Sequence, residues 1–238
     1  MNIKYTLVGL MILPLLVAKS VNAIEVNQAT IDAVKNTKID VVKLPITGMN
    51  AMDSNGQIMF VSDNGRFVIT GQIIDIWQKK TLDTMSEMAE VSGKIPMGGF
   101  NLDLDALNTV TIGNGDKEVI VFIDPQSEHC HTLIKQAMDL GSTYTFKLIV
   151  VPAMGEESNR LSKKLFCSVN RKSNIKAILD NSIDELEVHS DCDTKQYDKT
   201  LVLAQVIGIK GVPYLIAPDG RFFQGLPKNL NNWLEEKQ

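Results

Sequence analysis

The most informative pattern along the chain is an apolar run that stops abruptly and is followed by a helical repeat. Residues 119–123 are all apolar, which predicts a buried β-strand, and Asp124-Pro125 ends it. The next stretch is predicted to be a helix because apolar side chains recur in it at helical spacing. These side chains are Leu133, Ile134, Ala137 and Met138. The pattern therefore predicts a strand, a tight turn and a helix.

The first third of the chain predicts a small antiparallel sheet. Two β-rich runs, 57–62 and 66–71, flank Asp63-Asn64-Gly65. An Asn-Gly pair in this position is a strong hairpin signal, because both turn residues tolerate a positive φ. The other elements predicted here are a short helix at 29–34 and strands at 39–44 and 73–77. So small a sheet has a thin core, and a second copy of itself is its simplest partner.

The rest of the chain predicts a linker followed by an α/β region. A helix over 81–91 and a glycine-containing loop at 95–99 form the linker. Further elements are strands at 109–112 and 144–150, helices at 159–166 and 200–207, a short helical piece near 175–179, a hairpin from 211–216 to 221–223, and a closing helix through Leu230, Trp233 and Leu234. This order predicts a mixed sheet with helices packed on it. Phe222 and Phe223 alternate faces, so one of them is expected to be exposed.

The N-terminal segment carries the features of a secretory signal. Lys4 precedes an apolar run from Tyr5 to Ala18, and small or modest residues follow at 21–23. The run is too short to span a bilayer, so a cleaved signal peptide is expected, with an uncleaved anchor as the alternative. We predict a signal peptide at 1–23, an N-terminal domain at 24–80, a linker at 81–104 and an α/β domain at 105–238. The fold class is therefore α+β.

Charge and cysteine content narrow the function. The 238-residue chain has a formal net charge of −4 and no basic patch, which argues against a nucleic-acid partner. Its three cysteines are Cys130, Cys167 and Cys192. In an oxidising compartment we expect Cys167 and Cys192 to pair and Cys130 to stay free. A pairing that involves Cys130, or buried reduced thiols, remains the alternative.

The candidate site lies in the turn between the central strand and helix. Its four residues are Ser127-Glu128-His129-Cys130. A helix N-terminus favours a thiolate, and redox sites of this kind carry the motif C-x-x-C. Here a serine stands in place of the first cysteine of that motif.

Taken together, these segments resemble the bacterial periplasmic disulfide isomerases of the DsbC/DsbG type. The matching pieces are Phe60–Gly71, the helix from Thr81, Val121–Asp124 with Cys130-His131, the cysteine pair Cys167 and Cys192, and Gly211-Val212-Pro213. The resemblance implies a homodimer formed through the N-terminal domain, a thioredoxin-like C-terminal domain with a helical insertion, and unfolded or mis-disulfided secreted proteins as partners. It also implies a structural disulfide and a cis-proline loop at Val212 and Pro213 that pairs with substrate. No cofactor and no metal are expected.

The serine leaves two interpretations of the site. In the first, Ser127 survives as a helix N-cap, and the protein is a redox-impaired isomerase that acts as a chaperone or as an assembly factor for one envelope machine. In the second, Cys130 is a monothiol nucleophile whose pKa is lowered by His129 and the helix dipole and whose thiolate is hydrogen-bonded by Ser127. A partner oxidoreductase that supplies the missing thiol is left open.

Two other site chemistries fit the sequence poorly. Metal binding by His129, Cys130 and His131 is disfavoured because adjacent helical residues point about 100° apart. A serine hydrolase built on Ser127 lacks a nucleophile elbow and an accompanying base and carboxylate.

Overall fold

The structure is a computed structural model that describes residues 39–46, 48–54, 56–100 and 102–236. The predicted signal peptide at 1–23 and the predicted helix at 29–34 lie outside the described residues. Within the described ranges, no helix combines the length and the apolar character needed to cross a bilayer.

A four-stranded antiparallel sheet forms the first part of the described chain. Its strands, in spatial order, are β1 (Ile39–Lys43), β2 (Met49–Ser54), β3 (Gln57–Ser62) and β4 (Val68–Ile69). A separate hairpin joins β5 (Ile73–Asp75) to β6 (Lys80–Leu82), and helix α2 (Met85–Ser92) follows. The core between them is small and consists of Leu44, Ala51, Phe60, Leu82 and Met88. The predicted antiparallel sheet is therefore confirmed, although β2 and β6 were not foreseen.

The helix predicted from Thr81 begins later than the sequence suggested. Residues 80–82 pair with β5, and α2 starts after the N-cap Thr84. The Thr84 hydroxyl accepts the backbone N–H of Glu87, and the Glu87 carboxylate accepts the backbone N–H of Thr84, each at 3.1 Å. This reciprocal capping box satisfies two backbone donors, and the helix therefore begins at Met85, four residues beyond the predicted start.

The predicted hairpin turn is present with a different conformation. The Gly65 N–H donates to the Ser62 carbonyl at 2.7 Å, and Gly65 has a φ of 67°. Asn64, although it tolerates a positive φ, keeps a negative one here. Its side-chain oxygen instead accepts the Arg66 N–H at 3.0 Å and the Ser62 hydroxyl at 2.7 Å. Asn64 therefore stabilises the turn through its side chain.

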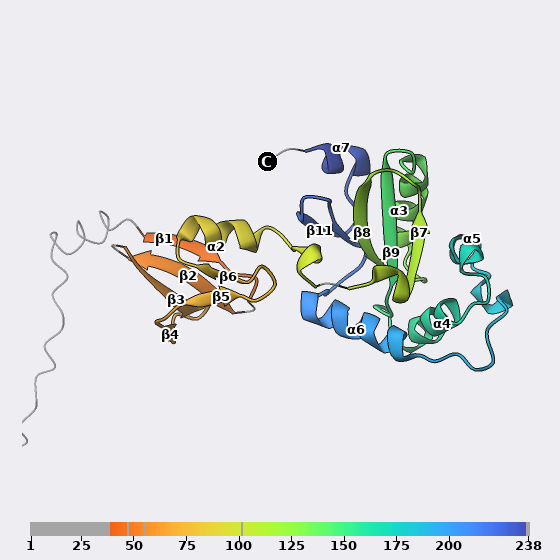
Figure 1. Cartoon of the computed structure of the whole chain (residues 1–238), viewed down its shortest axis with the longest axis horizontal. Coiled ribbons are helices and arrows are strands. Elements are labelled where there is room, and N and C mark those ends of the chain that lie inside the picture. Colours follow the sequence, from red (N-terminus) through yellow and green to blue (C-terminus); the bar gives the residue numbers. More distant parts are fainter. Residues whose placement is uncertain (1–38, 47, 55, 101, 237–238) are drawn as a thin grey trace, which may run out of the picture. The chain divides into compact units, whose positions relative to one another are not determined.

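The second sheet has five strands in a mixed arrangement (Figure 1). Its spatial order is β11 (Phe222–Gln224), β10 (Tyr214–Ile216), β8 (Lys117–Ile123), β9 (Tyr144–Val150) and β7 (Thr109–Ile112). Strands β8 and β9 are parallel, and the other neighbours are antiparallel. The strands predicted at 109–112 and 144–150 match β7 and β9.

Helices cover both faces of this sheet. Alternate residues of β8 enter two core clusters, Val121 and Ile123 on one face and Ile120 and Phe122 on the other. The first face is covered by α3 (Glu128–Asp139) and α7 (Leu230–Glu235), and the second by α6 (Lys195–Ile207). Such a doubly covered mixed sheet is the predicted thioredoxin-like fold, and the α+β class is confirmed.

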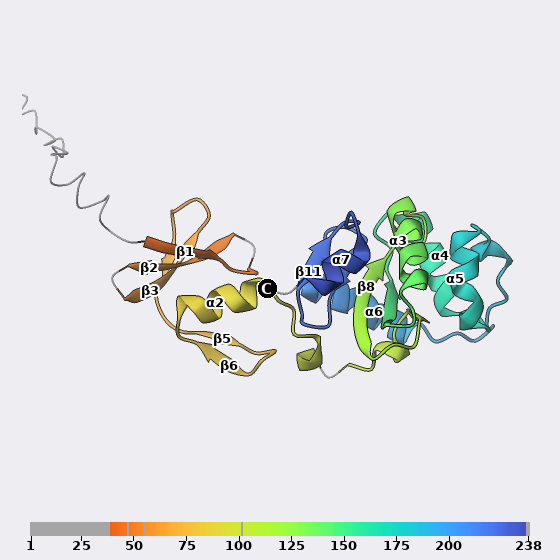
Figure 2. The same ribbon diagram turned by 90° about the horizontal axis from the view of Figure 1, so that it is seen from above.

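The predicted helical insertion joins β9 to α6. It contains α4 (Glu156–Phe166) and α5 (Asn174–Leu179), which lie close together in both views (Figures 1 and 2). One detail of α3 differs from the prediction. Met138 is 53% exposed, whereas Cys130 joins Leu133, Ile134 and Ala137 on the buried face. The domain boundaries at 24–80, 81–104 and 105–238 stay predictions.

Candidate active site

A buried aspartate fixes the turn between β8 and α3. Asp124 is fully buried, and its Oδ1 accepts the Gln126 N–H at 2.8 Å and the Ser158 hydroxyl at 2.9 Å. Its Oδ2 accepts the Met154 N–H at 2.8 Å. A buried carboxylate needs such donors to offset its lost hydration. The turn is therefore tied to the loop after β9, and this sets where Ser127 begins the helix.

Ser127 is the N-cap of α3. Its backbone is extended, with φ −83° and ψ 116°, and its hydroxyl accepts the Cys130 N–H at 3.4 Å. The first N–H groups of a helix lack intrahelical partners, and a serine oxygen is well suited to accept one of them. The predicted capping role of Ser127 is therefore confirmed.

Cys130 lies in the core beneath this cap. Its side chain has no exposed surface, and its thiol is free. Burial raises the pKa of the Cys130 thiol, and the Ser127 hydroxyl and a backbone hydrogen bond at Asp124 act in the opposite direction. Loss of hydration outweighs these hydrogen bonds. The sequence-based expectation of a lowered Cys130 pKa is therefore wrong.

The two flanking histidines lie in different surroundings. His129 is exposed, whereas His131 is buried and its Nε2 lies 2.8 Å from the Pro125 carbonyl oxygen, to which it donates. His131 thus adds a second tie across the turn. Across the described part of the chain, no group of three or more ligating side chains is arranged to hold a metal ion.

The proline loop lies beside this turn. The peptide bond between Val212 and Pro213 is cis, and Tyr214 pairs with Phe122 in the antiparallel register of β10 and β8. One residue further along that register, Pro213 is level with Ile123, the last residue of β8. The sheet therefore brings the predicted substrate-binding residues Val212 and Pro213 to the edge that holds the Ser127 turn.

An exposed aromatic side chain, Phe222, lies on the neighbouring strand β11. The Tyr214 ring stacks on Phe222, with centroids 5.7 Å apart, and Phe222 is 39% exposed. Phe223, by contrast, packs against the core and Trp233. The expectation that one of the two phenylalanines is exposed is confirmed, and it is Phe222.

The remaining two cysteines form a disulfide. Cys167 and Cys192 are bonded, with their Cα atoms 5.6 Å apart, and close the insertion that carries α5. The predicted pairing is confirmed, and the alternatives with Cys130 are excluded.

The N-terminal part of the chain matches a protein-family model. Residues 18–85 match the model described as the disulfide bond isomerase protein N-terminal domain. Curated relatives match over a longer span. The thiol:disulfide interchange protein DsbC of Escherichia coli K12 is 26% identical over 217 residues, which cover 84% of this chain and 82% of that protein. DsbC of Haemophilus influenzae is 24% identical and covers 81% of each chain.

The chain is thus similar to disulfide interchange proteins of the DsbC/DsbG type. Solved structures are more distant. The disulfide interchange protein of Neisseria gonorrhoeae has a TM-score of 0.43 and 23% identity, over 55% of this chain and 92% of that chain. DsbG of Helicobacter pylori has a TM-score of 0.35 and 17% identity, over 79% and 97% of the two chains.

The sequence analysis missed one feature around the site. This is the set of donors around Asp124, for which an aspartate directly after a fully apolar strand was the available signal. The burial of Cys130 agrees with its helical spacing to Leu133, Ile134 and Ala137. Catalytic roles for Cys130, Ser127 and His129 and substrate binding by Val212 and Pro213 stay predictions.

Proposed function

We propose that this protein is a periplasmic DsbC-like folding factor that acts on the folding or disulfide state of secreted proteins and has lost dithiol chemistry. Its likeness to the DsbC thiol:disulfide interchange proteins supports the general role. The loss of dithiol chemistry rests on the motif, because S-x-x-C has no second thiol with which to form or release a disulfide.

The observation that carries this proposal is the pairing of Ser127 and Cys130 at the start of α3. The serine hydroxyl serves as the cap, and the one thiol of the motif has no exposed surface. A thiolate attacks a disulfide only where it is both ionised and accessible. Cys130 in this conformation is neither, which favours the binding role over the monothiol alternative.

The monothiol alternative keeps one supporting contact. The Ser127 hydroxyl stabilises the Cys130 thiolate and so lowers the pKa that burial raises. Reaction of the thiol with a client would require the first turn of α3 to open, because the Cys130 side chain has no exposed surface. In this alternative Cys130 forms mixed disulfides with clients, and a partner oxidoreductase supplies the second thiol.

Clients would bind along the edge that holds the proline loop. Met154, tied to Asp124 by its backbone, is 58% exposed, and Phe222 is exposed beside Tyr214. Flexible thioether and aromatic side chains suit the binding of varied apolar segments. Val212 and Pro213 lie between the Ser127 turn and this aromatic side chain along the strand register.

The experiment that tests the proposal is reactivation of a scrambled-disulfide protein in a glutathione buffer. Wild type, Cys130→Ala and Ser127→Cys are compared side by side, together with suppression of client aggregation. We expect wild type and Cys130→Ala to suppress aggregation equally without isomerase activity, and Ser127→Cys to gain isomerase activity. Wild-type activity that disappears in Cys130→Ala would instead establish the monothiol enzyme.

The proposal includes a homodimer formed through the N-terminal sheet. Strand β4 is an edge strand, and its Val68 and Ile69 are 56% and 52% exposed. An unprotected apolar edge favours pairing with another strand. Val68→Glu is expected to shift the protein from dimer to monomer in sedimentation velocity. Val202→Glu, on α6 at 57% exposure, is the matched control and should stay dimeric. A dimer that survives Val68→Glu would place the interface elsewhere.

A further inference from the structure

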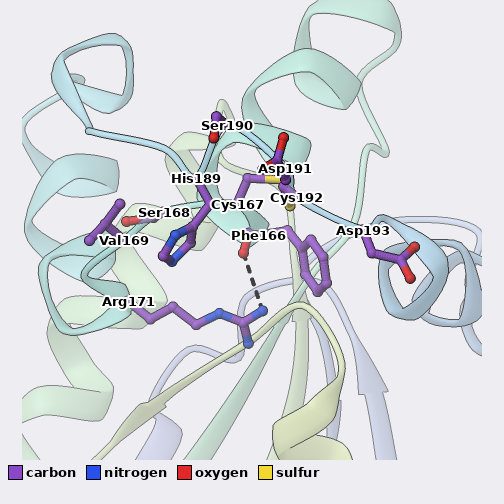
Figure 3. Close-up of a pocket in the computed structure, with 10 residues that line it drawn as sticks. All are labelled: Phe166, Cys167, Ser168, Val169, Arg171, His189, Ser190, Asp191, Cys192 and Asp193. Carbon is purple, nitrogen blue, oxygen red and sulfur yellow. Dashed lines mark hydrogen bonds between the residues drawn. A yellow bond between two sulfur atoms is a disulfide. The ribbon is translucent and has the colours of Figure 1, made fainter.

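A cavity lies away from the Ser127 turn, beside the disulfide (Figure 3). Its volume is about 530 Å³, within the usual size range of small-molecule sites. It is lined by two segments, 166–171 and 189–193, that the Cys167–Cys192 bond holds together. It shares no residue with the candidate active site.

Arg171 supplies the positive charge of this cavity. Its guanidinium donates to the Leu107 and Phe166 carbonyl oxygens, each at 3.2 Å, and lies 4.7 Å from the centre of the Phe166 ring. All of these partners are neutral, and no carboxylate among the described residues forms an ion pair with Arg171. Burial lowers its pKa. A partly desolvated cation without an anion, and with further N–H donors to spare, favours an anionic ligand.

Ser168 gives a second and independent indication. The residue is 4% exposed, and its Oγ has no hydrogen-bond partner among the described residues. A buried hydroxyl without a partner carries a free-energy cost that a ligand oxygen would remove. Ser168 lines the cavity, and Figure 3 shows it on the same side of the disulfide as Arg171 and His189.

We propose that this cavity binds a small organic monocarboxylate. Its carboxylate accepts hydrogen bonds from the Arg171 guanidinium and the Ser168 hydroxyl. Its apolar body packs on the Phe166 ring and Val169, which line the same cavity. The bidentate geometry of guanidinium and carboxylate makes such a contact specific as well as favourable.

The acidic side chains at the rim select for a single negative charge. Asp191 and Asp193 also line the cavity, and Figure 3 shows the Asp193 carboxylate on the side opposite Arg171. Asp193 is already paired with Lys195, at 3.1 Å. One guanidinium balances one carboxylate, whereas a phosphonate dianion would meet additional repulsion from the rim.

The test uses the full chain and two probes of nearly equal shape, phenylacetate and its neutral amide. Binding is followed by amide chemical shifts in NMR titrations of wild type, Arg171→Gln, Ser168→Ala and Lys172→Gln. Lys172→Gln is the matched control, because it removes the neighbouring positive charge from a residue outside the cavity lining. Phenylphosphonate serves as the dianion.

We expect phenylacetate to shift the signals of 166–171 and 189–193 and to bind about tenfold or more tightly than the amide. Arg171→Gln should abolish this preference, Ser168→Ala should reduce it, and Lys172→Gln should keep it. Because Arg171 also bonds two carbonyl groups, Ser168→Ala gives an independent reading if Arg171→Gln unfolds. Equal binding of acid and amide, no binding, shifts outside the two segments, or an unchanged preference in Ser168→Ala would each overturn the proposal.

Discussion

The chain holds its three cysteines in two contrasting places. Cys130 occupies the first turn of α3, where the motif places redox chemistry, but its side chain is fully buried. The disulfide of Cys167 and Cys192 lies in an insertion, where a structural role was expected, yet both residues are partly exposed and border a cavity. The cysteine of the motif is thus closed off from solvent, whereas the cysteines of the disulfide are accessible to it.

This contrast teaches that position in a motif does not decide the reactivity of a cysteine. The helix N-terminus favours a thiolate, but the pKa of Cys130 is raised because desolvation is the larger effect. With serine as the cap, nothing in the turn requires an exposed sulfur.

The largest expected effect is the protection of Cys130 from alkylation. Native protein should react with iodoacetamide about a thousandfold or more slowly than urea-unfolded protein, because reaction requires opening of α3. Since the Cys130 pKa is raised from its ordinary value of 9.0, the protection should persist as the pH rises to that value. The reaction is followed by mass spectrometry.

The same pKa shift sets the sign of a pH effect on stability. The folded state holds the Cys130 thiol proton more tightly than the unfolded state does. The resulting contribution to the free energy of unfolding is fully present at pH values below the unfolded-state pKa, and it is lost as the pH rises through the raised pKa of the folded state. Cys130→Ala is the control that should remove this alkaline loss. Rapid alkylation of the native protein at neutral pH would show that Cys130 is accessible and ionised, and it would support the monothiol alternative.

The next effect concerns the disulfide. Replacing both Cys167 and Cys192 by serine should lower the free energy of unfolding by about 3–4 kcal/mol, the chain-entropy value for a loop of this length. Urea unfolding measures the change. Dithiothreitol should shift wild type by a similar amount and leave the double variant unaffected. If dithiothreitol leaves the stability of wild type unchanged while the double variant is destabilised, the disulfide is protected from reduction in the folded protein despite its partial exposure.

The smallest effect concerns the cap above Cys130. Ser127→Ala should lower the free energy of unfolding by about 1 kcal/mol, because the Cys130 N–H loses its acceptor, whereas Ser127→Gly should cost only a few tenths. Thermal or urea unfolding distinguishes the two variants. Equal losses in both would mean that the serine stabilises the turn by packing and that its hydroxyl contributes little.

Much of the second sheet was predictable because its strands are long apolar runs. Strands β7 and β9 match the predicted ranges, and β8 extends two residues before the run at 119–123. In the first sheet, β2 and β6 were missed because polar or short segments give little periodic signal, and tertiary pairing decides them. The start of α2 was misplaced because Thr81 and Leu82 also fit a helical pattern, while the capping box at Thr84 settles the boundary.

The candidate site was predicted in position but not in electrostatics. Helical spacing places Cys130 three residues before Leu133, on the core side of α3, and burial there raises its pKa against the effect of the helix N-terminus. The cavity at Arg171 was not predicted, because the lining residues come from two segments that only the folded insertion brings together. Spacing along a chain reveals faces of one helix, whereas it reveals little about where two loops meet.

The cap at Ser127 has a consequence for how such a chain can evolve. Because serine meets the needs of the helix start without sulfur, a lineage can lose the attacking thiol and keep its scaffold intact. Most serine codons lie a single base change from a cysteine codon, so the loss is also easily reversed. The helix start on which a two-cysteine site depends is therefore present in this chain without the first cysteine.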